Sequence, residues 1–137
     1  MAIKLSVTVR NAKLDAIETA IGTAPLLKIR TGSAPATCAT ADSGTVLASI
    51  TCPSDWASAA SSGAKALLGT WSDTSADATG DAGHFRIYDS SGTTCHLQGT
   101  VTALSGGGDM ELQQATAGLV SGQTFTVSAL TLTEANS

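Results

Sequence analysis

The sequence predicts a mainly β protein, an antiparallel β-sandwich or jelly-roll-like domain with one N-terminal amphipathic helix. A helical spacing of apolar residues occurs only within residues 1–24. Short segments that alternate apolar and polar residues follow it, separated by turns rich in Gly, Ser and Thr. The strand–helix–strand alternation that builds parallel sheets does not occur, which favours antiparallel pairing.

The length and composition indicate one domain with a thin core. The 137 residues divide into an N-terminal arm and helix, residues 1–24, and a β-sandwich, residues 25–137. Aromatic residues are 4% of the chain, and charged residues are 13%, about half the usual share. A small core under a neutral polar surface favours contacts with other subunits, so we expect a homo-oligomer, with a trimer favoured.

The charge pattern excludes two classes of partner. The formal net charge is −4 and the 7 basic residues are scattered along the chain. Nucleic acids and anionic membranes attract clustered Lys and Arg, so we expect neither as a partner. The N-terminal segment contains no long apolar run of the kind found in signal peptides, which predicts a protein made in the cytoplasm.

One amphipathic helix is predicted near the N-terminus. Ser6 and Asn11 bound the region in which it begins, and Gly22 ends it. The apolar residues that share one face are Val7, Leu14, Ile17 and Ile21. Because it is the only helix, it must pack against a sheet or a neighbouring subunit.

The first ten residues also alternate as a strand does. The alternating apolar residues are Ile3, Leu5, Val7 and Val9. A segment that can form a strand can add to an exposed sheet edge of a partner, so we predict that these four residues bind a partner. An edge strand inside the domain explains the same pattern equally well.

The rest of the chain reads as strands and loops. The expected strands are Leu26–Thr31, Thr45–Cys52, Lys65–Trp71, His84–Asp89, Thr93–Val101, Met110–Leu112 and Thr124–Thr133. Gly32–Gly44 is a loop of small residues, and Leu104–Gly108 is a flexible connector. In the last strand the apolar parity changes near Ala129 and Leu130, which predicts a β-bulge there.

The clearest local signal is a β-hairpin around Ser90-Ser91-Gly92, with glycine in the left-handed position. Pairing Asp89 with Thr93 sets its register. This register places Phe85, Ile87, Cys95 and Leu97 on a core face, and His84, Arg86, His96 and Gln98 on a face toward solvent or an interface. The large residues expected in the core are Phe85, Ile87, Leu97, Val127 and Leu132.

No nucleotide-binding, hydrolase or zinc-protease motif is present, so we predict no enzyme, no catalytic residue and no cofactor. His84 and His96 are predicted to be diagonal neighbours, but the adjacent Arg86 disfavours a metal ion.

The segment Asp73–Asp81 spaces its oxygen ligands like a calcium loop. It lacks the glycine and glutamate that such a loop needs, which predicts an acidic solvated loop and no metal site.

Two aromatic residues and three cysteines leave alternatives open. Trp56 and Trp71 fit either core filling or a carbohydrate-stacking surface. Cys38, Cys52 and Cys95 fit buried thiols, or a Cys38–Cys52 disulfide under oxidising conditions with the third cysteine free.

Three groups of segments carry a resemblance to a known class of proteins. They are Lys28–Gly32 with Pro35 and Cys38, Gly83–Tyr88 with Cys95–Gly99, and Gly122–Val127 with Leu130–Thr133. Together they resemble small virion structural proteins of tailed bacteriophages, similar to capsid decoration or cement proteins. The resemblance implies a protein made in the host cytoplasm and located in the virion, where it binds and stabilises the major capsid shell. A tail or fibre component, or a carbohydrate-binding β-sandwich module, is the alternative.

Overall fold

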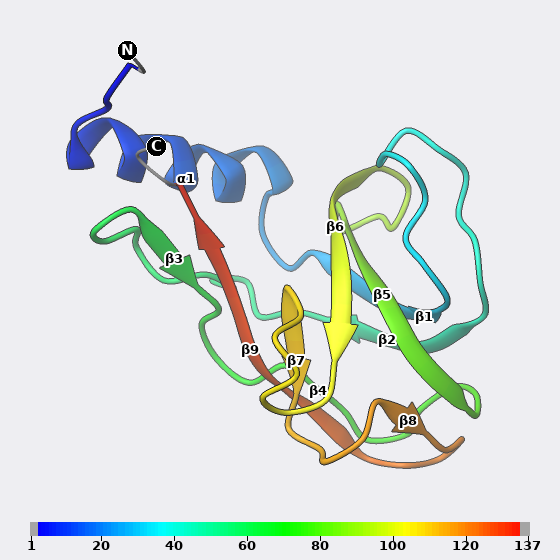
Figure 1. The fold of residues 1–137 in the computed structure, drawn as a ribbon. Coiled ribbons are helices and arrows are strands. Elements are labelled where there is room, and N and C mark those ends of the chain that lie inside the picture. The colour runs from blue at the N-terminus through cyan, green and yellow to red at the C-terminus, as the bar shows by residue number, and fades with distance from the viewer. Residues whose placement is uncertain (1–2, 135–137) are drawn as a thin grey trace.

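A computed structural model describes residues 3–134. Helix α1 (Val7–Ile21) comes first and is followed only by strands (Figure 1). The strands are β1 (Leu26–Thr31), β2 (Val46–Thr51), β3 (Ala64–Ala66), β4 (Ser72–Asp73), β5 (Gly80–Tyr88), β6 (Cys95–Thr102), β7 (Met110–Leu112), β8 (Gly118–Leu119) and β9 (Phe125–Thr133). The predicted class, a mainly β domain with one N-terminal helix, is confirmed.

Helix α1 begins and ends where the capping residues predict. The Ser6 hydroxyl accepts a hydrogen bond from the Val9 N–H at 3.2 Å. At the other end Gly22 has a φ of 86°, and its N–H donates to the Glu18 carbonyl. Leu14 and Ile21 are buried, so this face of the helix packs on the sheet. Val7, predicted on the same face, is exposed.

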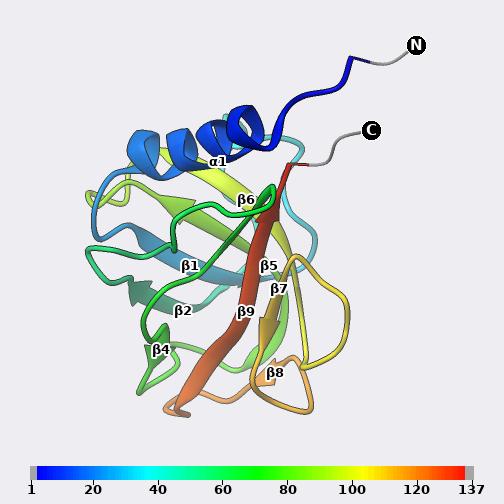
Figure 2. The ribbon, with the colours of Figure 1, turned by 90° about the vertical axis from the view of Figure 1, so that its left-hand side faces the viewer.

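The strands form one curled sheet in the order β2-β1-β5-β6-β7-β9-β3, with β4 paired to β9 and β8 paired to β5. The curl brings β9 across from β1 and β2, and α1 lies over one end of the curl (Figure 2). The purely antiparallel prediction is wrong for one pair, because β6 and β7 run parallel. The loop of residues 103–109 brings the chain back beside β6 before β7 begins.

Most strand predictions agree with the structure within a few residues. The largest differences are at the start of β5, which begins at Gly80 and not at His84, and among the shortest strands. The bounds of β1 and β7 match the prediction. The expected strand Lys65–Trp71 is wrong over most of its length, since β3 ends at Ala66. Strands β4 and β8 have two residues each and were not predicted. Two residues are too few to show any periodicity.

The predicted bulge in the last strand is confirmed. Leu112 pairs with Val127 and Glu111 pairs with Ala129, which leaves Ser128 as the extra residue. The extra residue reverses which side of the strand faces inward. Val127 and Leu130 are therefore both buried despite their different parity.

The predicted register of the hairpin is wrong by two residues. Gly92 has the expected positive φ of 72°, but the main-chain N–H of Asp89 donates to the Thr94 carbonyl, and Asp89 reaches Thr93 only through its side chain. A bulge between β5 and β6 then adds a second residue, so that Ile87 lies opposite Leu97. The bulge moves Cys95 from the predicted core face to the opposite face, beside Tyr88.

The core lies inside the curl of the sheet. Phe85, Ile87 and Val127 are buried as predicted. The prediction is wrong for Leu97, which packs partly buried against the core, and for Leu132, which is also only partly buried. The other large core residues are Leu27, Ile29, Leu47, Trp56, Trp71, Met110, Leu112, Leu119, Phe125 and Leu130. Within residues 3–134, no helix has the length and apolar character needed to cross a membrane.

Candidate functional site

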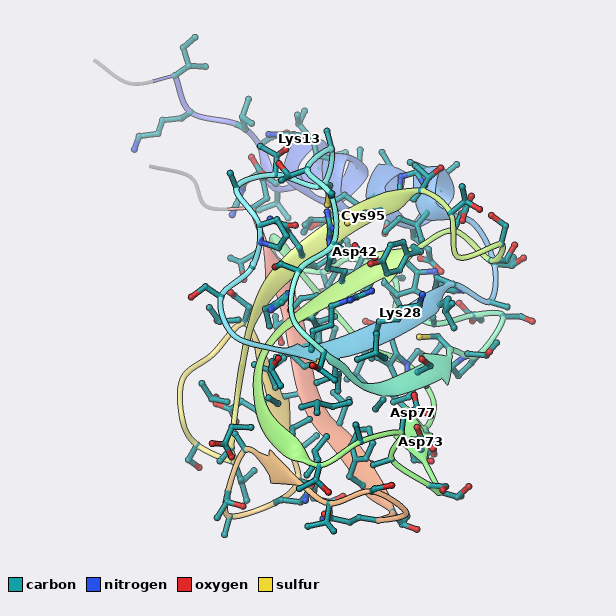
Figure 3. All side chains as sticks on the ribbon, turned by 90° about the vertical axis from the view of Figure 1, so that its right-hand side faces the viewer. Lys13, Lys28, Asp42, Asp73, Asp77 and Cys95 are labelled. Carbon is teal, nitrogen blue, oxygen red and sulfur yellow. The ribbon has the colours of Figure 1, made fainter. Side chains whose placement is uncertain are left out.

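The outer face of β1, β5 and β6 carries a group of buried polar side chains, and the more exposed Asp42 joins them from the segment before β2. We call it the Arg86 cluster; its members are Arg30, Asp42, Arg86 and Tyr88, with Cys38 and Cys95 at its rim. Residues 32–45, the covering loop, run over this face and bring Asp42 close to Cys95 (Figure 3). The predicted contact of the hairpin's polar face with solvent or an interface is therefore wrong for His84 and Arg86, which are 0% and 1% exposed.

Backbone geometry holds the covering loop near the sheet. Gly44 has a φ of 73°, and a Cβ atom placed on it would lie 2.1 Å from the Thr31 carbonyl oxygen. A Cβ on Gly83 would lie 2.2 Å from the Gly32 carbonyl oxygen. Only glycine allows the loop to approach β1 and β5 so closely at these two points.

The Arg86 guanidinium is bonded to the covering loop on several sides. Its Nη1 donates to the Asp42 carboxylate. Its Nη2 donates to three main-chain oxygens, those of Thr37 at 3.2 Å, Cys38 at 2.8 Å and Thr40 at 3.1 Å. Since both terminal nitrogens already have partners in the loop, this arginine is not free to bind an anionic substrate.

Asp42 is the acidic centre of the cluster. It accepts hydrogen bonds from Arg86, from Arg30 at 2.7 Å and from the Tyr88 hydroxyl at 2.6 Å. Burial alone would raise the pKa of Asp42, but the Tyr88 hydrogen bond and the two arginines outweigh it and lower that pKa. A carboxyl group with a lowered pKa stays ionised at neutral pH and is unsuited to act as a general acid.

The cysteines are arranged differently from the open alternative of a Cys38–Cys52 disulfide. Cys38 in the covering loop lies beside Cys95 of β6, with their sulfur atoms 2.6 Å apart. Cys52 is buried in the hydrophobic core. Burial raises the pKa of Cys95 to about 11 and that of Cys52 to about 12. Reactive cysteines have lowered pKa values, so neither thiol is prepared to act as a catalytic nucleophile.

A cavity of about 290 Å³ opens beside the cluster. Cys38, Asp42, Arg86, Tyr88 and Cys95 contribute to its wall. The charged groups on this wall are bonded to one another and to the loop, and the Cys95 thiol beside them is protonated at neutral pH. This arrangement can clamp the loop to the sheet, and it gives the cavity few free groups with which to orient a substrate.

The two histidines are not the predicted diagonal neighbours. His84 lies opposite Thr100, is buried, and its Nδ1 lies 2.8 Å from the Gly32 carbonyl oxygen. His96 is exposed at the bulge in β6. The different positions follow directly from the two-residue change of register.

The segment that resembles a calcium loop is tied into the protein by its main chain. The Asp73 carboxylate accepts a hydrogen bond from the Ser75 N–H at 2.8 Å, as in an ordinary turn. The N–H of Asp77 donates to the Leu47 carbonyl, and Ala76 is buried. Across the described part of the chain, no three acidic, His or Cys side chains are grouped to hold a metal ion.

The predicted flexible connector Leu104–Gly108 is instead an ordered turn. The Glu111 carboxylate accepts hydrogen bonds from the N–H groups of Ser105 and Gly107, both at 3.1 Å. The Gly108 N–H donates to the Thr102 hydroxyl. A carboxylate on the following strand therefore organises the glycines, which sequence spacing did not indicate.

The tryptophans belong to the core. Trp56 and Trp71 are 1% and 0% exposed, and their ring centroids are 6.1 Å apart. Their indole N–H groups donate to the carbonyls of Gly22 and Leu68. A carbohydrate-stacking surface formed by these two rings is therefore excluded, and core filling is confirmed.

The predicted partner-binding residues lie at the start of the described chain. Ile3, Val7 and Val9 are 87%, 47% and 45% exposed. Residues 3–6 have no regular secondary structure and α1 begins at Val7, so an internal edge strand over Ile3, Leu5, Val7 and Val9 is excluded. Three large apolar side chains thus project from this segment.

A buried lysine joins α1 to β3. The Lys65 ammonium group is bonded to Asp15 at 2.8 Å, to Glu18 at 2.7 Å and to the Ser58 carbonyl at 2.7 Å. Burial would lower the pKa of Lys65, but the two carboxylates outweigh it and raise that pKa. A lysine that stays protonated cannot act as a base or as an amine nucleophile.

Sequence reasoning did not find the Arg86 cluster or the Lys65 contacts. Arg86 and Lys65 look like solvent-facing residues of alternating strands, and no periodicity shows which segment of small residues covers them.

Comparison with known proteins adds no assignment: no family model, curated protein or solved structure matches the chain.

Proposed function

We propose that this chain is a virion structural protein, a capsid decoration or cement protein that binds and stabilises the major capsid shell as a homo-oligomer. The observation that carries the proposal is the projecting N-terminal segment. Among residues 3–134, Ile3, Val7 and Val9 are three of the six large hydrophobic side chains that are exposed. Apolar side chains gathered in one exposed segment favour attachment to another protein.

The use of the buried charged groups supports a structural role. Arg86 holds the covering loop through Asp42 and main-chain oxygens, and Lys65 holds the helix, so each cation contributes to the rigidity of the subunit. The resemblance of the strand and turn segments to small virion proteins favours a virion over other large assemblies. Without an exposed tryptophan platform, the carbohydrate-binding alternative has lost the observation on which it depended.

The proposal is tested with particles from the strain that carries the gene. Mass spectrometry of purified particles is expected to find the protein at a constant ratio to the major capsid protein. Recovery with isolated tails would favour the tail alternative. Absence from all particle fractions would contradict a virion role.

Attachment is tested with two matched double variants. Ile3→Ser with Val7→Ser removes apolar area from the projecting segment. We expect its binding to particles from which the native protein has been removed to weaken at least ~100-fold. Leu68→Ser with Val120→Ser removes exposed apolar area elsewhere and should leave binding nearly unchanged. Equal binding by the two folded variants would show that the segment is not the attachment site. Circular dichroism verifies the fold of each.

A further inference from the structure

We propose that Cys38 and Cys95 form an intramolecular disulfide when the protein meets a small-molecule disulfide oxidant, and that this bond fastens the covering loop to the sheet. The proposal does not depend on a virion function, because both cysteines belong to one chain and one fold. It assigns a covalent modification site to a pair that lies 57 positions apart in the sequence.

The fold already places both sulfur atoms together. They are 2.6 Å apart, closer than two unbonded sulfur atoms pack. The bulge in β6 is essential, since it turns Cys95 to the outer face beside Tyr88. Arg86 holds the other partner, because its Nη2 donates to the main-chain oxygen of Cys38 itself. Disulfides form readily only where the backbone brings both cysteines close, which is the case here.

Cys52 is not placed to form a competing disulfide with either rim cysteine. Cys52 is 2% exposed and belongs to the hydrophobic core, whereas Cys38 and Cys95 are partly exposed on the opposite face. Both rim cysteines line the cavity of about 290 Å³, which gives a small reagent a route to them. We therefore expect one disulfide and one remaining thiol.

The reaction is a thiol–disulfide exchange with oxidised glutathione as the oxidant. One cysteine thiolate attacks the reagent, its S–S bond breaks, and one glutathione thiol leaves. The second cysteine loses its proton and attacks the mixed disulfide, and the second glutathione thiol leaves. Two protein thiols are oxidised, one glutathione disulfide is reduced, and the two protons pass to the released thiols.

The Cys38–Cys95 disulfide restricts the motion of the covering loop. Cys38 lies between Thr37 and Thr40, whose carbonyls are also bonded to Arg86. A covalent bond at the same place holds the loop even when these hydrogen bonds open. A link across 57 positions restricts the unfolded chain strongly, which predicts a rise of the melting temperature on the order of 10 °C.

The full-length reduced protein is treated with oxidised glutathione and then analysed by mass spectrometry. We expect a mass loss of two hydrogen atoms. A protease that cleaves before aspartate cuts at Asp42 and Asp55, which places Cys38 and Cys52 on different peptides. The Cys38 peptide should be linked to the Cys95 peptide. Cys52 should react with an alkylating agent only after denaturation.

Matched variants make the result decisive. Cys52→Ala should gain the same rise in melting temperature on oxidation, and a reductant should reverse it. Cys38→Ser and Cys95→Ser should each lose this rise. A bridge that contains Cys52, stable glutathione adducts on both rim cysteines, or disulfide-linked dimers would overturn the proposal. If a variant does not fold, the peptide map of the unmodified chain still decides.

Discussion

Tyr88 is the single tyrosine of the chain, and its hydroxyl donates to the Asp42 carboxylate. Burial, followed by the bond to Asp42, raises the pKa of Tyr88 to about 12. At pH 11 we expect roughly a tenth of this tyrosine to be ionised in the folded protein and roughly nine-tenths in the denatured protein. Phenolate absorbance measures the fraction, with circular dichroism as the check that the protein remains folded.

The raised pKa also sets how Tyr88 contributes to stability. The folded pKa lies above the unfolded value of about 10, so the contribution is present below pH ~10 and is lost as the pH rises toward 12. Asp42→Asn removes the negative charge and should lower the Tyr88 pKa. Complete ionisation of folded Tyr88 at pH 11 would show that burial and the bond to Asp42 do not raise its pKa.

At the residue scale, apolar positions were easier to predict than buried charges. The alternation of Phe85 and Ile87 along β5 correctly placed both in the core. The residues that alternate with them, His84 and Arg86, were assigned by the same rule to a face toward solvent or an interface. They are buried because the covering loop lies over them, and a loop of small residues has no period that shows where it packs.

At the scale of elements, local signals predicted the helix well and the strand register poorly. Ser6 and Gly22 determine the ends of α1 through contacts within a few residues. The hairpin register depends on the length of its loop and on the bulge at His96, which carries no glycine or proline to mark it. This missing signal also explains why the proximity of Cys95 to Cys38 could not be predicted.

The attachment of α1 to β3 leads to a prediction at this scale. Lys65→Ala removes the ammonium group that bonds to both Asp15 and Glu18, together with the buried side-chain carbons. Hydrogen bonds to charged groups contribute more than neutral ones, so we expect the melting temperature to fall by roughly 5–10 °C. Thermal unfolding followed by circular dichroism measures this change.

Lys13 on the same helix provides the control. Its ammonium group is paired with Glu134, but the side chain is 51% exposed. Exposed ion pairs contribute little, so Lys13→Ala should change the melting temperature by only about 2 °C or less. Equal effects of the two substitutions would show that Lys65 does not hold the helix.

At the scale of the whole molecule, the fold class followed from the order and spacing of its segments. One helical pattern followed by short alternating segments was enough to predict a mainly β domain. The curl of the sheet and the parallel pairing of β6 with β7 depend on contacts between distant strands. Such contacts leave no periodic trace in a single sequence.

The thin core and the projecting segment lead to a prediction about assembly. We expect a trimer, so light scattering should give a mass of about three times 13.6 kDa. Its melting temperature should rise with protein concentration, because association stabilises the folded state. A constant mass of 13.6 kDa up to high concentration would contradict this expectation.

The packing of α1 has a consequence for the order in which the chain is synthesised. Leu14 of the helix and Leu130 of β9 line the same cavity, and the Arg10 guanidinium donates to the Glu134 carbonyl. The helix therefore leaves the ribosome before β9, which completes the surface that the helix packs on. During translation, the part of its apolar face that β9 covers stays accessible to chaperones until β9 emerges.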